Sequence, residues 1–169
     1  MAQSDIASEK QVLESFLNAQ RGHVTGILDG LGEDALRRSV LPSGWIPLGL
    51  VQHLALDVER FWFRAVIAGE QDVIDHLDDT ENAWQVSGDL TAGEIFDLYR
   101  DEIARANRIV ESTPLDAAPA WWPDFFGTFR LNTVREIVLH VIEETACHAG
   151  HLDAARELID GQRWVVLTE

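Results

Sequence analysis

The sequence contains a single cysteine, few basic residues and no long apolar run. One cysteine, Cys147, cannot form an internal disulfide. No stretch approaches the roughly 18–20 apolar residues that a membrane helix needs, and residues 1–10 lack the basic region and apolar stretch of a signal peptide. The formal charge of −16, with no basic patch to offset it, repels phosphate groups. We therefore expect a cytoplasmic protein that binds neither membranes nor nucleic acid.

What remains is the composition of a globular protein. The chain has 169 residues, of which 46% are hydrophobic, enough to bury a core. It shows no internal repeat, low-complexity tract or long linker, which predicts one domain over residues 1–169. Apolar residues recur at helical spacing near residues 9–31, 47–69, 92–112 and 134–159. Four long helices without strand alternation predict an all-α four-helix bundle, a fold that often holds metal sites between facing helices.

Short motifs at the ends of these stretches support the helix assignment. A Ser or Thr followed three residues later by Glu or Gln forms a capping box at a helix N-terminus. This pattern occurs three times, at Ser8 and Gln11, at Thr91 and Glu94, and at Thr133 and Glu136. Pro47 suits the first turn of the second helix, and Gly161 is typical of a residue that ends a helix.

The last predicted helix carries a polar stripe around the segment EETACHAGHL, residues 143–152. At about 100° per residue, five side chains of this helix lie within roughly 100° of one another: His140, Glu144, Cys147, His148 and His151. The stripe overlaps the apolar face, so we expect part of it to be buried. A buried carboxylate is costly unless it is paired or bound to a cation. Glu144 and His148, one turn apart, are spaced to converge on one divalent ion.

The second predicted helix supplies a third candidate ligand. In the segment LVQHLALDVERFWF, His53 lies beside the apolar face, and Asp57 follows four residues later. Asp57 is placed to accept a hydrogen bond from the second ring nitrogen of a ligating histidine. Two histidines and one carboxylate, with one position left open, are typical of catalytic zinc and of some non-haem iron sites. The residues alone leave an alternative open, because a lone core histidine is usually structural and Glu-x-x-x-His pairs arise by chance.

The other polar residues of these helices have more than one interpretation. Cys147 is better explained as a small packed residue than as a nucleophile, because no activating cation is evident. His151 has three interpretations: a fourth metal ligand, a base that contacts the ligands, or a surface histidine. His140 either packs in the core or contacts a metal ligand. Arg60 either orients a substrate carboxylate through two hydrogen bonds or forms a surface salt bridge.

Two stretches resemble a known superfamily. They are LDGLGEDALRRSVLPSGWIPLGLVQHLALDVERFWF, residues 28–63, and FRLNTVREIVLHVIEETACHAGHLDAARELIDG, residues 129–161, and together they cover nearly half of the chain. They resemble the DinB/YfiT-like metal-binding four-helix bundles, in particular the actinobacterial branch related to mycothiol-dependent maleylpyruvate isomerase. In that branch the metal is held by a His-Glu-His set. The resemblance implies that the metal ligands are His53, Glu144 and His148.

The resemblance also implies a chemistry. Enzymes of this superfamily are thought to bind a low-molecular-weight thiol at the metal, where it ionises readily and attacks an electrophile. We therefore expect transfer or addition of mycothiol, or a similar thiol, to a small electrophile through a metal-bound thiolate. The ligand set favours zinc over nickel, iron or manganese. The catalytic groups stay open, with His151, Asp57 and Arg60 as candidates, and relatives that dimerise suggest a homodimer.

Two other functions remain compatible with the sequence. A metal-dependent hydrolase would use the same ligands with water as the nucleophile. A non-catalytic metal-binding or ligand-binding stress protein would need no open position at the metal, as in a site closed by His151.

Overall fold

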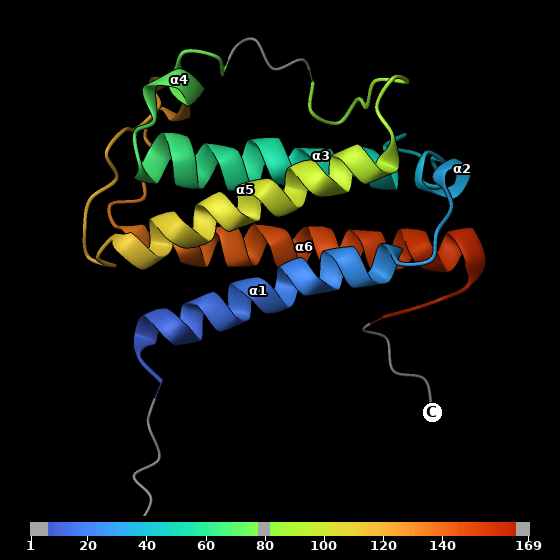
Figure 1. Ribbon diagram of the computed structural model, residues 1–169, viewed down its shortest axis with the longest axis horizontal. Coiled ribbons are helices and arrows are strands. Elements are labelled where there is room, and N and C mark those ends of the chain that lie inside the picture. Colours follow the sequence, from blue (N-terminus) through green and yellow to red (C-terminus); the bar gives the residue numbers. More distant parts are fainter. Residues whose placement is uncertain (1–6, 78–81, 165–169) are drawn as a thin grey trace, which may run out of the picture.

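The computed structural model describes residues 7–77 and 82–164. Within these ranges all regular secondary structure is helical. The long helices are α1 (Glu9–Leu28), α3 (Pro47–His53) continued by η1 (Leu54–Ile67), α5 (Ala92–Ser112) and α6 (Val134–Asp160). Short helices lie between them: α2 (Glu33–Leu36), α4 (Gln71–Ile74) and η2 (Asp124–Phe126). The predicted all-α, DinB-like bundle is confirmed (Figure 1).

The long helices pack as two parallel pairs that run in opposite directions (Figure 1). α1 lies along α6, and α5 lies along η1. Ionic and polar contacts fix the first pair at both ends. Arg135 near the start of α6 binds Glu9 at the start of α1, and Arg156 near the end of α6 donates to the Ile27 carbonyl oxygen. None of the described helices is long and apolar enough to cross a membrane.

The predicted helix ends are largely confirmed. All three capping boxes are formed by both of their hydrogen bonds. Pro47 occupies the first turn of α3, and Gly161, with a φ of 79°, ends α6. The first helix ends at Leu28, three residues before the predicted end at Leu31. The chain leaves the helix at Asp29, whose ψ is 137°, and turns at Gly30, whose φ of 77° belongs to the left-handed region that glycine adopts without a steric penalty.

The second long helix changes its winding at His53. The residues of η1 form a π-helix, in which each turn holds more residues than in an α-helix. The Ala68 N–H, for example, donates to the Phe63 carbonyl oxygen at 3.0 Å, five residues back. Side chains of η1 are buried on nearly every side, as expected for a helix that packs against several neighbours. The apolar spacing in the sequence predicts an α-helix with 3.6 residues per turn, so it does not predict this winding.

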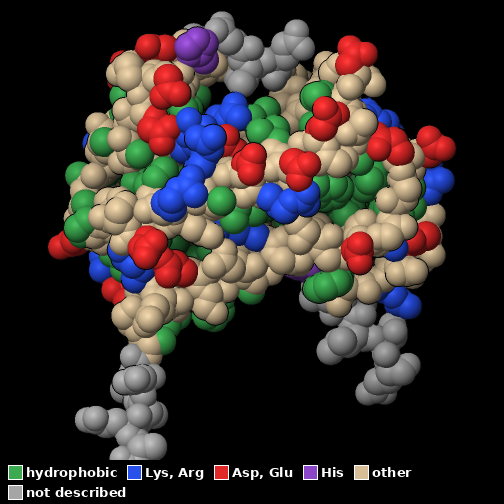
Figure 2. Space-filling model, viewed as in Figure 1, with side chains coloured by type: hydrophobic (Ala, Val, Ile, Leu, Met, Phe, Trp, Pro, Cys, Tyr) green, Lys and Arg blue, Asp and Glu red, His purple; other side chains and the backbone are tan. Residues whose placement is uncertain are grey.

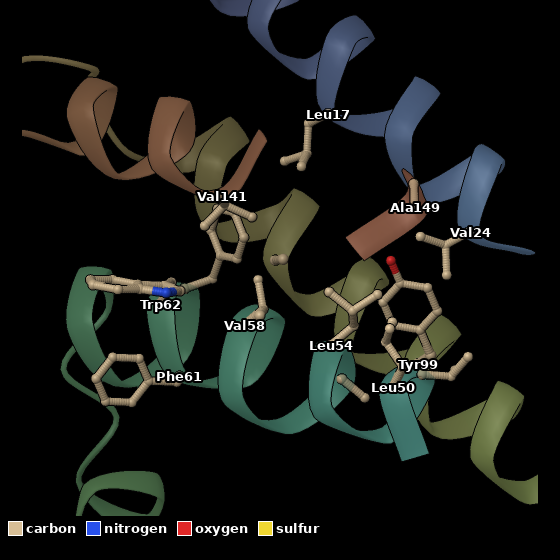
Figure 3. Close-up of a cluster of buried hydrophobic side chains, with 14 of the residues drawn as sticks. Leu17, Val24, Leu50, Leu54, Val58, Phe61, Trp62, Tyr99, Val141 and Ala149 are labelled. Atoms are coloured by element: carbon tan, nitrogen blue, oxygen red, sulfur yellow. The ribbon is translucent and has the colours of Figure 1, made fainter. Parts of the chain in front are cut away.

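The core lies where η1 meets α1, α5 and α6. Figure 3 shows side chains from four helices meeting there, including Leu17 of α1, Val58 of η1, Tyr99 of α5 and Val141 of α6. None of these four is more than 1% exposed. The apolar core therefore packs α3 and η1 against α5 and α6 and places His53 beside α6.

An ion pair between α1 and η1 lies inside this core. The Arg21 guanidinium of α1 binds the Glu59 carboxylate of η1 through two hydrogen bonds of 2.7 and 2.6 Å. Its third nitrogen donates to the side-chain oxygens of Asn18 and Asn107. Burial raises the pKa of Glu59, against the opposing effect of Arg21. Since Asn107 belongs to α5, this network joins three helices.

Removing the arginine of this pair should destabilise the protein strongly. Arg21→Met leaves Glu59 buried without its partner, so we expect the free energy of unfolding to fall by about 3–5 kcal/mol. Urea unfolding followed by circular dichroism measures this loss. Arg135→Met is the matched control, because it removes an arginine from the exposed pair with Glu9 and should leave the stability nearly unchanged. Equal losses in the two variants would contradict a special role for the buried pair.

Candidate metal centre

Three side chains from two helices converge on one point. His53 is the last residue of α3, and Glu144 and His148 lie one turn apart on α6. One ligand atom from each of the three lies within 4.8 Å of the other two. His53 Nε2 is 4.0 Å from Glu144 Oε1, and the rings of His53 and His148 have centroids 5.0 Å apart. The structure thus brings together the three residues that the resemblance assigned as ligands.

His53 is oriented from two sides. Its Nδ1 forms a 2.8 Å hydrogen bond with Asp57 Oδ2, the contact that the sequence predicts. The Trp84 ring stacks on the imidazole with centroids 4.3 Å apart and planes 21° apart. A carboxylate at Nδ1 fixes the tautomer and leaves Nε2 with its lone pair, which is the arrangement of a metal-binding histidine. Trp84 is a part of the site that sequence reasoning missed, because nothing local marks a tryptophan in an acidic loop.

Two buried polar atoms of these residues form no hydrogen bond among the described residues. They are His148 Nδ1 and Glu144 Oε2, and the latter has an ionic contact with His140 Nε2 at 3.4 Å. A buried acceptor without a partner costs stability, so such atoms call for an explanation. A divalent cation would satisfy them, and two imidazoles with one carboxylate form a donor set that suits zinc. The residues present therefore fit a metal ion.

The electrostatics favour the protonation states that a metal needs. Burial opposes ionisation of Glu144, but the nearby histidines, His140 foremost, outweigh it and hold the pKa of this carboxyl below its ordinary value. Burial lowers the pKa of His148 to about 4, and His53 adds to this effect. At neutral pH the carboxylate is therefore ionised and His148 is neutral. Both are the forms that coordinate a cation.

His140 contributes more to this site than its sequence position suggests. Its Nε2 lies 3.4 Å from Glu144 Oε2, one helical turn along α6. The Trp62 ring of η1 stands edge-on to the imidazole, with centroids 4.7 Å apart. Glu144 is thus flanked by His53 at one oxygen and His140 at the other. The four-residue spacing of His140 and Glu144 is the one signal in the sequence that points to this contact.

The other candidates lie at the edge of the site or outside it. His151 is exposed, and its ring centroid is 5.7 Å from that of His148. Arg60 binds the buried Glu102 of α5 at 3.0 and 2.9 Å, so its guanidinium is held by a protein carboxylate. Cys147 is exposed, so the prediction that it is a packed residue is wrong, and it is not part of the three-residue cluster.

A family model described as Mycothiol-S-transferase matches residues 12–161. The chain belongs to the mycothiol-S-transferase family. This family is DinB-like, in agreement with the resemblance noted in the sequence. No curated protein and no solved structure matches the chain. In this mycothiol-S-transferase family member, the match includes all three residues of the cluster.

Metal affinity should distinguish His140 from His151. We expect His140→Ala to weaken zinc binding about 10- to 100-fold, because residues that hold a ligand in place contribute on this scale. His151→Ala should leave the affinity unchanged, since the ring lies beside the cluster. Titration of metal-free protein against a chelating dye measures both. His140→Gln, whose amide can still donate to Glu144, should recover part of the loss. A larger loss of zinc affinity in His151→Ala than in His140→Ala would indicate that His151 is a metal ligand and would contradict this prediction.

The lowered pKa of His148 predicts a pH-dependent stability of the metal-free protein. An unfolded histidine titrates near pH 6.5, whereas the folded value is about 4. Between these values the unfolded chain takes up a proton that the folded protein does not, so the free energy of unfolding falls as the pH falls through this window. His148→Asn should make this fall shallower in urea unfolding at pH 7 and pH 5. An equally steep fall in the variant would contradict the shift.

Proposed function

We propose that this protein is a divalent-metal-dependent S-transferase that adds or transfers mycothiol, or a similar low-molecular-weight thiol, to a small electrophile. The observation that carries the proposal is the convergence of His53, Glu144 and His148 within 4.8 Å. It is supported by the match of residues 12–161 to a mycothiol-S-transferase family. One carboxylate and two imidazoles gathered inside an apolar bundle are well suited to hold a cation.

Each residue of the cluster has a distinct part in this proposal. His53 and His148 would hold the ion with neutral imidazoles, and Glu144 would supply one negative charge, a set for which zinc is the first choice. When bound, such an ion would lower the pKa of a coordinating thiol, so that the thiol would be ionised at neutral pH. Asp57 keeps His53 in one tautomer, and His140 restrains Glu144. Trp84 covers one face of His53 and excludes water from it.

The reacting sulfur would come from a cosubstrate. The only cysteine of the chain, Cys147, is exposed and lies outside the three-residue cluster. Three protein ligands leave one position of a four-coordinate site for an external group. Exposed His151, at the edge of the cluster, would be close to that group. The arrangement therefore suits a thiol that arrives from solution better than a nucleophile built into the chain.

The proposal predicts thiol-dependent turnover that requires His53. Zinc-loaded protein is incubated with mycothiol and a panel of small electrophiles, and the thioether product is followed by mass spectrometry. We expect His53→Ala to lose at least about 100-fold in rate, because it removes a ligand. His23→Gln is the matched control, since His23 lies on α1 against Trp164, outside the cluster.

Two outcomes would contradict the proposal. The first is wild-type turnover equal to that of His53→Ala with every electrophile. The second is turnover of esters or amides without any thiol, which would identify a hydrolase at the same residues.

A further inference from the structure

A short uncharged segment that precedes α5 lies over α3 and carries Trp84 (Figure 1). Its sequence, residues 82–86, is NAWQV, so no ion pair of its side chains can hold it in place. The short helix α4 is held differently, since Figure 2 shows basic side chains grouped beneath it, where Arg64 binds Glu70. The position of Trp84 is therefore set by hydrogen bonds and by packing against α3.

Gln52, the residue before His53 in α3, holds the backbone on both sides of Trp84. Its side-chain nitrogen donates to the Ala83 carbonyl oxygen at 2.9 Å and to the Gln85 carbonyl oxygen at 3.3 Å. Gln52 is only 8% exposed, so water competes little for these hydrogen bonds. A side-chain amide has two N–H donors, and Gln52 uses both of them to fix this segment on α3.

Gly49 leaves the space that the same segment fills. A Cβ atom at this position would lie 2.3 Å from the Trp84 carbonyl oxygen, closer than Cβ atoms come to backbone atoms in proteins. Residues three apart on an α-helix share one side, so Gly49 and Gln52 face the segment together. The carbonyl groups of residues 83–85 therefore all meet α3 within one turn of His53.

This attachment places the Trp84 ring against two of the proposed metal ligands. The ring stacks on His53 with centroids 4.3 Å apart, and it meets His148 of α6 at 5.7 Å with planes 63° apart. The two histidines, which belong to different helices, thus share one aromatic neighbour. A shift of this ring would change the packing of both imidazoles and the access of water to them.

We propose that Gln52 is a positioning residue that holds Trp84 against His53 and His148 and so keeps both imidazoles set for a metal ion. Gly49 has the complementary part, because its missing side chain lets the segment approach α3. Neither residue belongs to the three-residue cluster, so both act through Trp84. The inference rests on the proposed function only in that a cation binds at the cluster.

Proton NMR of the full-length, metal-free protein tests the position of Trp84 directly. A proton above an aromatic face resonates upfield, so the ring protons of His53, assigned with His53→Ala, should be shifted upfield in the wild type. Gln52→Leu and Gly49→Ala should each move these signals toward their values in Trp84→Ala. Gly22→Ala is the matched control and should leave them unchanged, since no atom of the described residues lies within 4 Å of a Cβ there. Unchanged His53 signals in Gln52→Leu would overturn the proposal.

Zinc affinity tests whether Gln52 acts through Trp84. Titration against a chelating dye should show that Gln52→Leu and Trp84→Ala each weaken zinc binding roughly two- to tenfold, the range of one aromatic contact. In the double variant the two losses should not add, because Gln52 no longer influences the ion once the ring is gone. Additive losses would contradict the proposal, since Gln52→Leu would then perturb the site by another route. A wild-type protein that binds no zinc would overturn the proposed metal function, and the NMR result would still decide the role of Gln52.

Discussion

The buried ion pair between Arg21 and Glu59 is the contact on which the arrangement of the helices depends. Two charges inside an apolar core are tolerated only when they meet with good geometry, and here both guanidinium–carboxylate hydrogen bonds are formed. We infer that the pair permits one rotational setting of η1 against α1. His53 and Asp57 belong to the same continuous helix as Glu59, two to six residues away, so their direction toward α6 follows from that setting.

The candidate centre contains buried polar groups that lower the stability of the folded protein. Glu144 Oε2 and His148 Nδ1 are buried without hydrogen-bond partners among the described residues. Burial also keeps the pKa of His148 far below its ordinary value. Such features are costly in a protein that binds nothing, and they are common where a functional group must be ready to bind. The apolar contacts of η1 and the capped ends of α6 supply the stability that offsets them.

A cavity of about 580 Å³ between η1, α4 and the loop that contains η2 is connected to the candidate centre by two sets of contacts. On one side Asp57 lines the cavity and binds His53. On the other, Phe126 lines the cavity and stacks on Trp62, with centroids 5.6 Å apart, and Trp62 in turn contacts His140. The cavity therefore reaches His53 through Asp57 alone, and Glu144 through Phe126, Trp62 and His140 in turn.

The sequence by itself determined the features that depend on neighbours along the chain. Three capping boxes, Pro47 and Gly161 marked helix ends within a few residues, and the four-residue spacing placed Glu144 beside His148. The pattern of the second helix and the resemblance both pointed to His53, and the structure brings it to the same point. Only the tertiary structure decided the π-helical winding of η1, the pairing of Glu59 with Arg21, the capture of Arg60 by Glu102 and the place of Trp84. The last three depend on contacts between residues 31 to 42 positions apart, which packing selects and local propensity does not encode.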